Sequence, residues 1–374
     1  MGISYNPSIA TSGLVFYYDA GNTKKSWKGA PTTNLVTNPS FTSGLWPNTW
    51  NATSGTTVLT GSTYNGGAIV RSTLNFATSH GSQTANDATI TSSTVVSISL
   101  DVRASRSMNL NYTYLMRSGG VGNLVFPSQA ITTDWTRVSM TVTNTITTSC
   151  GVLVGIVQSA GDWFEYTNVQ LETQPFATPF VNGTRSNTQS LVDLTNNGTI
   201  TSTSLTYASD GTFSFNGSST YVDVVSSGLT SGMTVYTIMF WARRDAENRM
   251  PVATRTGSTF YWYGDNSWKY QHSGVNGEYY YSKPTSIPLG TWGHYCVVYN
   301  GADVSIYRQG IFQGLQATTG TADWSVGLRI GYWAAGDTSR YWQGSIDAVS
   351  MYNRALSASE VEQNFNALRG RYGI

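Results

Sequence analysis

Clusters of aromatic side chains with polar neighbours are the residues of this sequence best suited to chemistry. They lie in three segments, TFYWYGDNSWKYQ at 259–271, GEYYYSK at 277–283 and RIGYWAAGDTSRYWQG at 329–344. A flat ring offers an apolar face to the C–H face of a sugar, and a neighbouring amide, carboxylate or guanidinium can hydrogen-bond its hydroxyl groups. This combination predicts non-covalent carbohydrate binding.

The candidate glycan-binding residues are five ring platforms and three polar neighbours: Trp262, Trp268, Tyr270, Trp333 and Tyr341, with Asp265, Asn266 and Arg340. Alternate residues of a strand point to opposite faces, so a strand formed by TFYWYG would carry rings on both sides. One set can fill a core while the other meets a ligand or another subunit. Core packing is the competing interpretation for every single ring. Trp268 and Tyr341, which polar turn residues flank, are the least core-like.

Acidic residues and histidines do not form a recognisable catalytic set. Glycosidases place two carboxyl groups on either side of the scissile bond, and no E-x-D-x-x-E pattern occurs here. Glu278 has no evident partner, and we interpret Glu165 and Glu172 as a solvated or calcium-near edge. The three histidines lack metal-ligand spacing, and GxSxG, P-loop and dinucleotide motifs are absent. The sequence therefore predicts a protein that is not an enzyme.

Composition indicates an all-β protein with two domains. Charged residues make up 11% of the 374 residues and aromatic residues 13%, which suits short strands joined by polar turns. A chain of this length exceeds the usual size of one core. The net charge of +1 gives no basic footprint for nucleic acid. No apolar run could span a bilayer, and the first residues do not resemble a signal peptide.

One helix and two cysteines complete the local predictions. Ser357 and Glu360 form a capping box, Leu356 and Val361 supply the hydrophobic staple, and Gly370 is placed to end the helix. Cys150 and Cys296 lie in apolar strand patterns. We predict that both are buried free thiols.

The segment GSIDAVSMYNRALSASEVEQNF at 344–365 closely resembles the last strand and terminal helix of laminin-G-type domains, which have the concanavalin A-like sandwich fold. Residues 210–224, 236–245 and 290–314 fit earlier strands of that family, and DAGNTKKSW at 19–27 fits its opening. Ala348 replaces the usual second acid of the closing motif. The resemblance implies a β-sandwich over the C-terminal part of the chain.

An inserted domain explains why residues 28–188 separate that opening from its expected continuation at 189–200, since a folded insert with adjacent ends costs little. NLVTNPSFTSGLWPNTW at 34–50 resembles the first strand of jelly-roll carbohydrate-binding modules. The phrase QLE–ATPFVNGTR within 170–185 resembles a tail found after such modules in tailed-phage structural proteins. We predict a discontinuous sandwich of residues 1–32 and 186–374, interrupted by a jelly roll at 33–185.

A calcium site is the metal site that these resemblances imply, because sandwiches of both types often hold the ion at an edge. Asp19 ends the first predicted strand and Asp347 lies in the closing motif, so these two are the candidate ligands. The alternative is that Asp347 hydrogen-bonds backbone.

Three functions follow, in order of preference. The first is a non-enzymatic phage virion protein, assembled in the host cytoplasm and displayed on the particle as a head decoration, fibre or tail-associated component. Its expected partners are other virion proteins, further copies of the chain and cell-surface or environmental glycans, with no nucleic acid and no membrane insertion. The second is a carbohydrate-binding adhesin or lectin. The third is a glycoside hydrolase.

Overall fold

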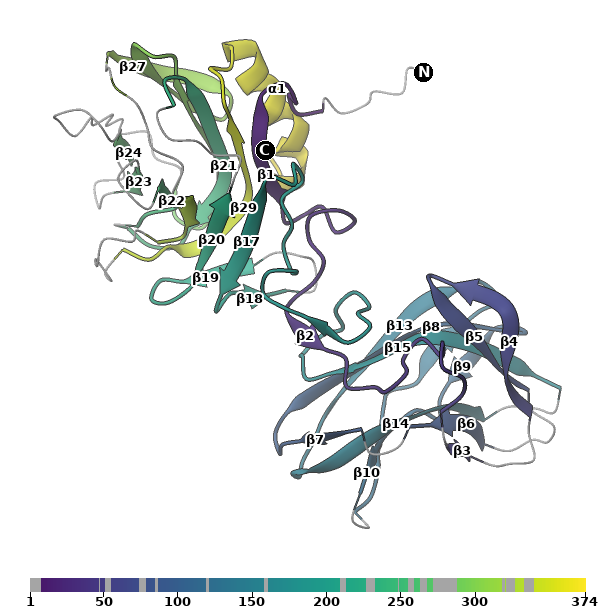
Figure 1. Ribbon diagram of the computed structural model, residues 1–374. Helices are drawn as coiled ribbons and strands as arrows, with labels where there is room; N and C mark the ends of the chain where they lie inside the picture. The colour runs from purple at the N-terminus through teal and green to yellow at the C-terminus, as the bar shows by residue number, and fades with distance from the viewer. Residues whose placement is uncertain are drawn as a thin grey trace. The chain divides into compact units, whose positions relative to one another are not determined.

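β-Strands form nearly all of the regular structure in the computed structural model, and one short α-helix lies near the C-terminus (Figure 1). The structure describes residues 8–374 except 47, 51–54, 74–78, 85–86, 119–120, 158–160, 209–212, 227–232, 248, 255–258, 263–267, 272–287, 318–319, 321–326 and 333–339. Contacts divide the chain into a first unit, residues 1–30 with 187–374, and a second unit, residues 31–186. The boundaries expected from the sequence, 32/33 and 185/186, lie within two residues of these.

The first unit is a sandwich of an eight-stranded and a six-stranded sheet. The larger sheet has the order β18-β19-β29-β21-β25-β26-β27, with β1 also paired to β29, and the smaller has the order β17-β20-β28-β22-β23-β24. Their bounds are β1 Leu14–Asp19, β17 Gly198–Thr203, β18 Thr206–Tyr207, β19 Phe213–Asn216, β20 Tyr221–Ser226, β21 Tyr236–Arg244, β22 Val252–Thr254, β23 Thr259–Trp262, β24 Trp268–Gln271, β25 Trp292–Tyr299, β26 Asp303–Arg308, β27 Ile311–Ala317, β28 Leu328–Ile330 and β29 Gln343–Tyr352.

Strand β21 shows why the larger sheet is covered on both faces. Ile238 and Phe240 point into the core between the sheets, while Met239 and Trp241 point outward. Because these outward side chains are also apolar, they need cover. Helix α1 (Ala358–Leu368) provides it (Figure 1), and its Val361 and Phe365 pack against the outer face of the sheet.

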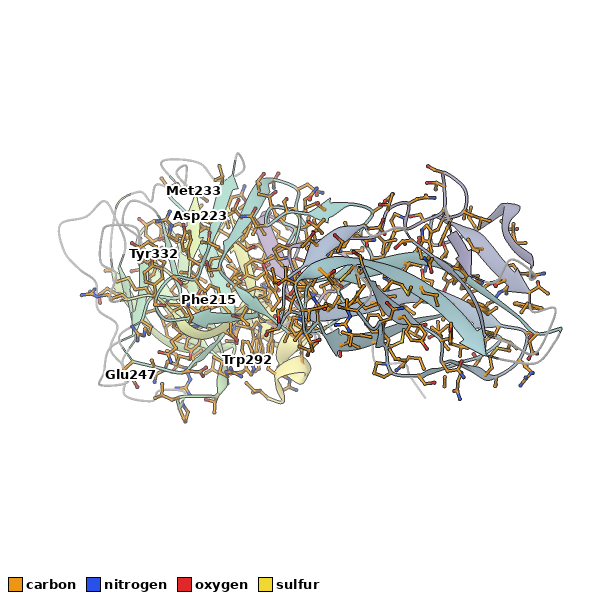
Figure 2. All side chains as sticks on the ribbon, turned by 90° about the horizontal axis from the view of Figure 1, so that it is seen from below. Phe215, Asp223, Met233, Glu247, Trp292 and Tyr332 are labelled. Carbon is orange, nitrogen blue, oxygen red and sulfur yellow. The ribbon has the colours of Figure 1, made fainter. Side chains whose placement is uncertain are left out.

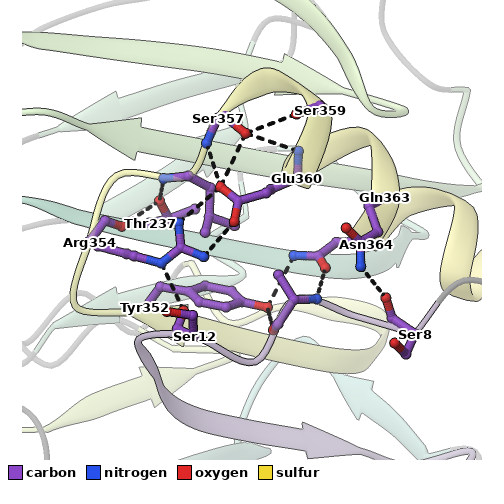
Figure 3. A network of polar contacts seen from close by, with 12 residues as sticks. Ser8, Ser12, Thr237, Tyr352, Arg354, Ser357, Ser359, Glu360, Gln363 and Asn364 are labelled. Carbon is purple, nitrogen blue, oxygen red and sulfur yellow. Dashed lines mark hydrogen bonds and ion pairs between the residues drawn. The ribbon is translucent and has the colours of Figure 1, made fainter.

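The N-terminus of α1 has the predicted capping box, shown in Figure 3. The Ser357 side chain accepts from the backbone N–H of Glu360, and the Glu360 carboxylate accepts from the Ser357 backbone. Arg354 pairs with the same carboxylate at 2.6 Å, and Asn364 donates to the Tyr352 hydroxyl at 3.0 Å. The prediction that Gly370 ends the helix is wrong. The chain continues into a 3₁₀ turn at Arg369–Tyr372, and Gly373 takes the left-handed conformation with φ 70°.

The first strand and the segment after the insert lie together in the first unit. Trp27 forms a β-bridge with Leu191, and backbone hydrogen bonds join Lys28 to Ser190 and Val192 to Ser26 at 2.8 Å each. In the second unit, β2 (Thr32–Thr33) pairs with β16 (Thr184–Arg185). The two ends of the second unit are therefore adjacent, as an insert requires.

The second unit also contains two main sheets. One has the order β13-β8-β15-β5-β4, the other has the order β11-β10-β14-β6-β3 with β7 paired to β14, and β12 pairs with β9. Their bounds are β3 Asn48–Trp50, β4 Gly55–Tyr64, β5 Gly67–Thr73, β6 Ser79–Gln83, β7 Ala88–Ile90, β8 Val95–Ala104, β9 Met108–Leu110, β10 Tyr114–Arg117, β11 Leu124–Val125, β12 Gln129–Ile131, β13 Thr136–Thr143, β14 Thr148–Val157 and β15 Trp163–Glu172.

Several local predictions are confirmed. The fold is all-β with one short C-terminal α-helix. Cys150 and Cys296 are buried free thiols, one in each unit. None of the helices among the described residues combines the length and apolarity needed to cross a membrane.

Candidate functional site

The outer face of the six-stranded sheet carries the clearest candidate site of the first unit. On β20 and β28, Val222, Val224 and Ile330 point into the core, and alternation places Tyr221, Asp223 and Arg329 on the opposite side. Tyr332 follows β28, and Tyr341 stacks against it. We call Tyr221, Asp223, Arg329, Tyr332 and Tyr341 the tyrosine face. Figure 2 labels Asp223 and Tyr332 of this face.

A salt bridge fixes the centre of the tyrosine face. Asp223 and Arg329 are register partners on β20 and β28. Arg329 donates from Nε to Asp223 Oδ1 at 2.7 Å and from Nη2 to Oδ2 at 3.3 Å. The two side chains are 16% and 14% exposed. This two-point geometry orients the guanidinium plane and leaves the pair without net charge.

The tyrosine rings surround that pair. The Arg329 guanidinium carbon lies 5.2 Å from the ring centre of Tyr221 and 5.4 Å from that of Tyr332. Tyr332 and Tyr341 are stacked with ring centres 4.0 Å apart and planes inclined by 10°. Partial burial and the neighbouring Tyr332 hydroxyl raise the pKa of Tyr341, so its hydroxyl stays protonated. The face thus offers half-buried rings, neutral hydroxyl groups and one oriented guanidinium.

The structure places only part of the predicted set in this face. Tyr341 belongs to it, and Arg340, half-buried, precedes it in the chain. Trp262 and Trp268 are register partners on β23 and β24, but their side chains lie outside the described part of the structure. Asp265, Asn266 and Trp333 also lie outside the described residues.

The structure contradicts the prediction that Tyr270 is a ring platform for a glycan. Its side chain is 2% exposed within the core, and its hydroxyl is hydrogen-bonded to that of Tyr236. Its position on β24 turns it inward, so its ring cannot serve as a platform for a ligand. Trp46, an aromatic side chain of the second unit, is likewise buried in the core of that unit.

Four residues of the tyrosine face were missed by sequence reasoning. The alternation in Tyr221-Val-Asp223-Val could have indicated that Tyr221 and Asp223 share an outward face. Arg329 lies 106 residues from Asp223, and nothing local to either residue specifies that pairing. Tyr332 was hidden among the other aromatic residues of its segment.

The two predicted calcium ligands do lie together, but a side chain supplies the cation. Arg371 donates from Nη2 to Asp19 Oδ2 at 3.1 Å, and its Nη1 lies 3.7 Å from Asp347 Oδ2. The Tyr372 hydroxyl donates to Asp347. Burial is the main cause that raises the pKa of Asp347 to about 6, which disfavours the ionised ligand that calcium needs. The guanidinium of Arg371 therefore supplies the positive charge that the two carboxylates share, and calcium at these residues stays a prediction.

The structure also contradicts the prediction that Glu165 and Glu172 form a solvated edge, because both residues are 0% exposed. Glu172 accepts from the Thr178 backbone at 2.7 Å and its hydroxyl at 2.8 Å. Glu165 accepts from two arginines, Arg71 and Arg103. These carboxylates are fully engaged by their own chain, so they lack the freedom of a catalytic pair.

A small cavity between the larger sheet and α1 is unsuited to a ligand. Its volume of about 10 Å³ has room for roughly one water molecule. His294 lines it, and burial lowers the pKa of this histidine to about 3. The imidazole is therefore neutral at physiological pH. Within the described ranges no three His, Cys, Asp or Glu side chains gather as a metal site.

Comparison with known proteins agrees with this architecture. Residues 216–362 match the family model described as the concanavalin A-like lectin/glucanases superfamily, of the laminin G type. The matched residues include β20, β28 and β29. The first unit therefore has a lectin-like, jelly-roll sandwich fold. No curated protein matches the chain.

Solved structures with similar folds include the binding domain of Paraclostridial Mosquitocidal Protein 1, at 18% sequence identity and a TM-score of 0.38. The match covers 47% of this chain and about half (49%) of that one. The heptameric pentraxin of Limulus polyphemus has 20% identity and a TM-score of 0.30, covering 36% and 70% of the two chains. Domain 4 of an arabinanase from Geobacillus stearothermophilus has 18% sequence identity and a TM-score of 0.34. The match covers 48% of this chain and 92% of that domain. These values concern the fold alone.

Proposed function

We propose that the protein is a carbohydrate-binding protein without enzymatic activity and that the tyrosine face contacts the saccharide. The observation that carries this proposal is the Tyr332–Tyr341 stack, with ring centres 4.0 Å apart, beside the fixed Arg329–Asp223 pair. The stack provides a broad apolar surface, and the hydroxyl and guanidinium groups supply directional hydrogen bonds.

The charge balance of the face favours a neutral saccharide. Asp223 compensates Arg329 across the two strands, so an acidic ligand would have to compete with an existing two-point ion pair. A sugar hydroxyl can instead accept from an outer N–H of the guanidinium without breaking that pair. One contact surface of this kind gives weak binding, and several copies would be needed for firm attachment.

Absence of hydrolysis is part of the proposal. Glycosidases need two carboxyl groups across the bond, whereas Asp223 is occupied by Arg329 and stands on this face with no second acid among the described residues of the face. The third function considered, a glycoside hydrolase, predicts release of reducing sugar from a glycan panel. Hydrolysis that Asp223→Asn abolishes would replace the proposal with that function.

Replacing Tyr341 tests the assignment. A panel of neutral oligosaccharides is screened on the full chain, and the best binder is titrated by calorimetry. We expect Tyr341→Ala to weaken binding by about tenfold, equivalent to about 1.4 kcal/mol. The matched control is Tyr114→Ala, which removes one ring of the half-buried Tyr112–Tyr114 pair in the second unit. Equal affinities of the two variants would refute the tyrosine face as the site.

We further propose that the protein is displayed on the surface of a tailed-phage particle, where it is assembled with other virion proteins. The support is the resemblance of the phrase at 170–185. In the structure this phrase is a folded end to the second unit: Gln170 donates to Glu172 at 2.8 Å, and Arg185 donates to Pro179. Such a fixed connector suits a module built into a larger assembly.

Mass spectrometry of purified particles, with immunogold microscopy, tests the virion proposal. Regular labelling at one position of the head or tail is the expected result. A preparation of intact particles that lacks the protein would overturn this placement and leave a free adhesin as the function.

A further inference from the structure

The outer face of the five-stranded sheet in the second unit combines arginines with aromatic rings. We propose that it binds an acidic saccharide, one that carries a carboxylate or a sulfate. We call this the tryptophan–arginine face, and it comprises Tyr64, Arg71, Arg103, Trp135 and Trp163 above the buried Glu165. It lies in the unit outside the family match and takes a different ligand class from the tyrosine face.

Strand pairing brings the charged side chains into one row. Glu165 on β15 is the register partner of Arg71 on β5 and of Arg103 on β8. The neighbouring Phe164 and Tyr166 belong to the core, so Glu165 points to the other side of the sheet, together with Trp163. The row therefore has a guanidinium on each side of one carboxylate.

The row has an excess of positive charge. Glu165 is fully buried, whereas the side chains of Arg71 and Arg103 are 36% and 34% exposed. Arg71 donates from Nε to Glu165 Oε1 at 2.8 Å, and Arg103 donates from Nε to Oε2 at 2.6 Å. Two guanidinium groups against one carboxylate leave one positive charge. Within the described residues, the Nη groups of Arg103 have no hydrogen-bond partner.

The rings hold the guanidinium groups in place. The Arg71 guanidinium carbon is 4.4 Å from the ring centre of Trp163, and that of Arg103 is 5.1 Å from Trp135. Tyr64 extends the surface by stacking on Trp135, with ring centres 4.3 Å apart and planes inclined by 10°. Cation–π contacts of this kind orient a guanidinium and reduce the entropy lost when it binds a ligand.

These features together define the ligand. A carboxylate or sulfate can accept two hydrogen bonds from the Nη groups of Arg103, while the attached sugar ring lies on the indole of Trp135 or Trp163. Single-stranded nucleic acid also uses arginine and stacked rings. A nucleic-acid site needs a basic track along the strand, however, and here Glu165 cancels one of the two charges while the whole chain carries only +1.

Titration of the full chain with three tetrasaccharides tests the site. A hyaluronan tetrasaccharide supplies the carboxylate, a heparin-derived tetrasaccharide supplies sulfate, and chitotetraose is neutral. We expect at least one acidic probe to bind, with affinity that falls as salt rises, and the two acidic probes identify which anion is preferred. In the Tyr341→Ala chain, which lacks the ring stack proposed to bind neutral sugars, binding of chitotetraose with an affinity equal to that of both acidic probes would overturn the proposal, as would equally tight binding of a thymidine oligonucleotide.

Variants locate the binding. Arg103→Gln leaves Glu165 paired with Arg71 and should weaken acidic binding about tenfold. Trp135→Ala should weaken it without removing a charge. The matched control is Arg117→Gln on β10 of the other sheet, where Arg117 donates to the Gly122 carbonyl at 2.7 Å. Acidic binding that is unchanged in both Arg103→Gln and Trp135→Ala refutes the site.

Two further measurements separate loss of the binding site from loss of the fold. Hydrogen exchange of β8 and β15 shows whether each variant is folded. Arg103→Lys replaces the planar guanidinium group by an ammonium group, which acts as a point charge. This variant should therefore bind more weakly than the native chain if Arg103 acts through two parallel hydrogen bonds. Tyr341→Ala should leave acidic binding unchanged. Failure of the tyrosine face and failure of this second face are therefore separate results.

Discussion

The tyrosine face and the tryptophan–arginine face use the same ingredients in different proportions. Each lies on the outward side of a sheet and packs guanidinium groups against aromatic rings. In the first unit Arg329 has Asp223 for itself. In the second unit Arg71 and Arg103 share Glu165. One extra arginine thus separates a neutral surface from a positive one, and this difference decides which sugars each face should accept.

In a third cluster the carboxyl groups outnumber the guanidinium groups. Beside the C-terminal turn, Asp19 and Asp347 share the single guanidinium of Arg371. One carboxyl group is left over, and burial raises the pKa of Asp347 to about 6, so this group takes up a proton at a higher pH than an ordinary aspartate. The cluster is closed by Tyr372 rather than open to a ligand. An excess of buried acid therefore produces a pH-sensitive structural contact, whereas an excess of exposed guanidinium produces a candidate binding surface.

The largest expected effect comes from removing the shared acid of the second unit. Glu165→Gln leaves Arg71 and Arg103 side by side without a counter-charge, and we expect a loss of about 2–3 kcal/mol in unfolding free energy, because solvent reaches both guanidinium groups only in part. Urea unfolding, with hydrogen exchange of β15 to assign the transition, measures it. The control is Asp162→Asn, which breaks the more exposed pair with Arg106 and should cost about 1 kcal/mol or less. Equal losses of unfolding free energy in the two variants would show that Glu165 stabilises the fold no more than an exposed ion pair does.

The pH dependence of the acid-rich cluster comes next. The folded state raises the pKa of Asp347 from 3.8 to about 6, so it binds this proton more tightly than the unfolded chain. The contribution of Asp347 to stability is therefore greatest below about pH 4 and decreases as pH rises to about 6. The slope should reach up to roughly 1.4 kcal/mol per pH unit in that window.

Comparing the native chain with Asp347→Asn isolates this contribution. The unfolding free energy of the variant minus that of the native chain should increase between pH 4 and pH 6 and stay level above. A difference that stays constant across this range would mean that Asp347 ionises normally in the folded protein. Tyr372→Phe serves as a second variant, because it removes the hydrogen bond to the carboxylate without removing the ring that stacks on Trp241.

Converting one face into the other gives a smaller effect. Asp223→Asn leaves Arg329 without its carboxylate, so the tyrosine face should acquire the charge excess of the second unit. We expect weak binding of a heparin-derived tetrasaccharide to appear there, together with a loss of about 1–2 kcal/mol in stability. Chemical-shift changes on β20 and β28 would report the new contact. Shifts confined to the second unit would contradict the charge argument.

Local features of the sequence predicted local structure well. The Ser357–Glu360 capping box depends on residues three apart, and the structure has it. Alternation of apolar residues indicates strands at 94–102, 135–143 and 150–158, and β8, β13 and β14 match these ranges to within two residues. These elements follow from periodicity and turn chemistry, which neighbouring residues specify.

The site chemistry was predicted poorly because it depends on which strands are neighbours. Arg371 lies 352 residues from Asp19, and Glu165 lies 94 and 62 residues from its two arginines. Periodicity shows that Glu165 and Tyr270 each lie on one face of a strand, but it does not show which face is covered. The sequence therefore predicts a solvated Glu165 and a platform role for Tyr270, whereas both side chains are buried.

The smallest expected effect separates ring from hydroxyl in the tyrosine face. Tyr341→Phe keeps the stack on Tyr332 and removes one hydroxyl group. If sugar stacking supplies most of the affinity, binding of a neutral saccharide should fall by only about two- to threefold, well short of the loss in Tyr341→Ala. Stability should change by about 0.5 kcal/mol or less, because the hydroxyl is only partly buried. Equal losses in the two variants would instead assign the affinity to the hydroxyl, and the face would then select a sugar by hydrogen bonding rather than by its apolar surface.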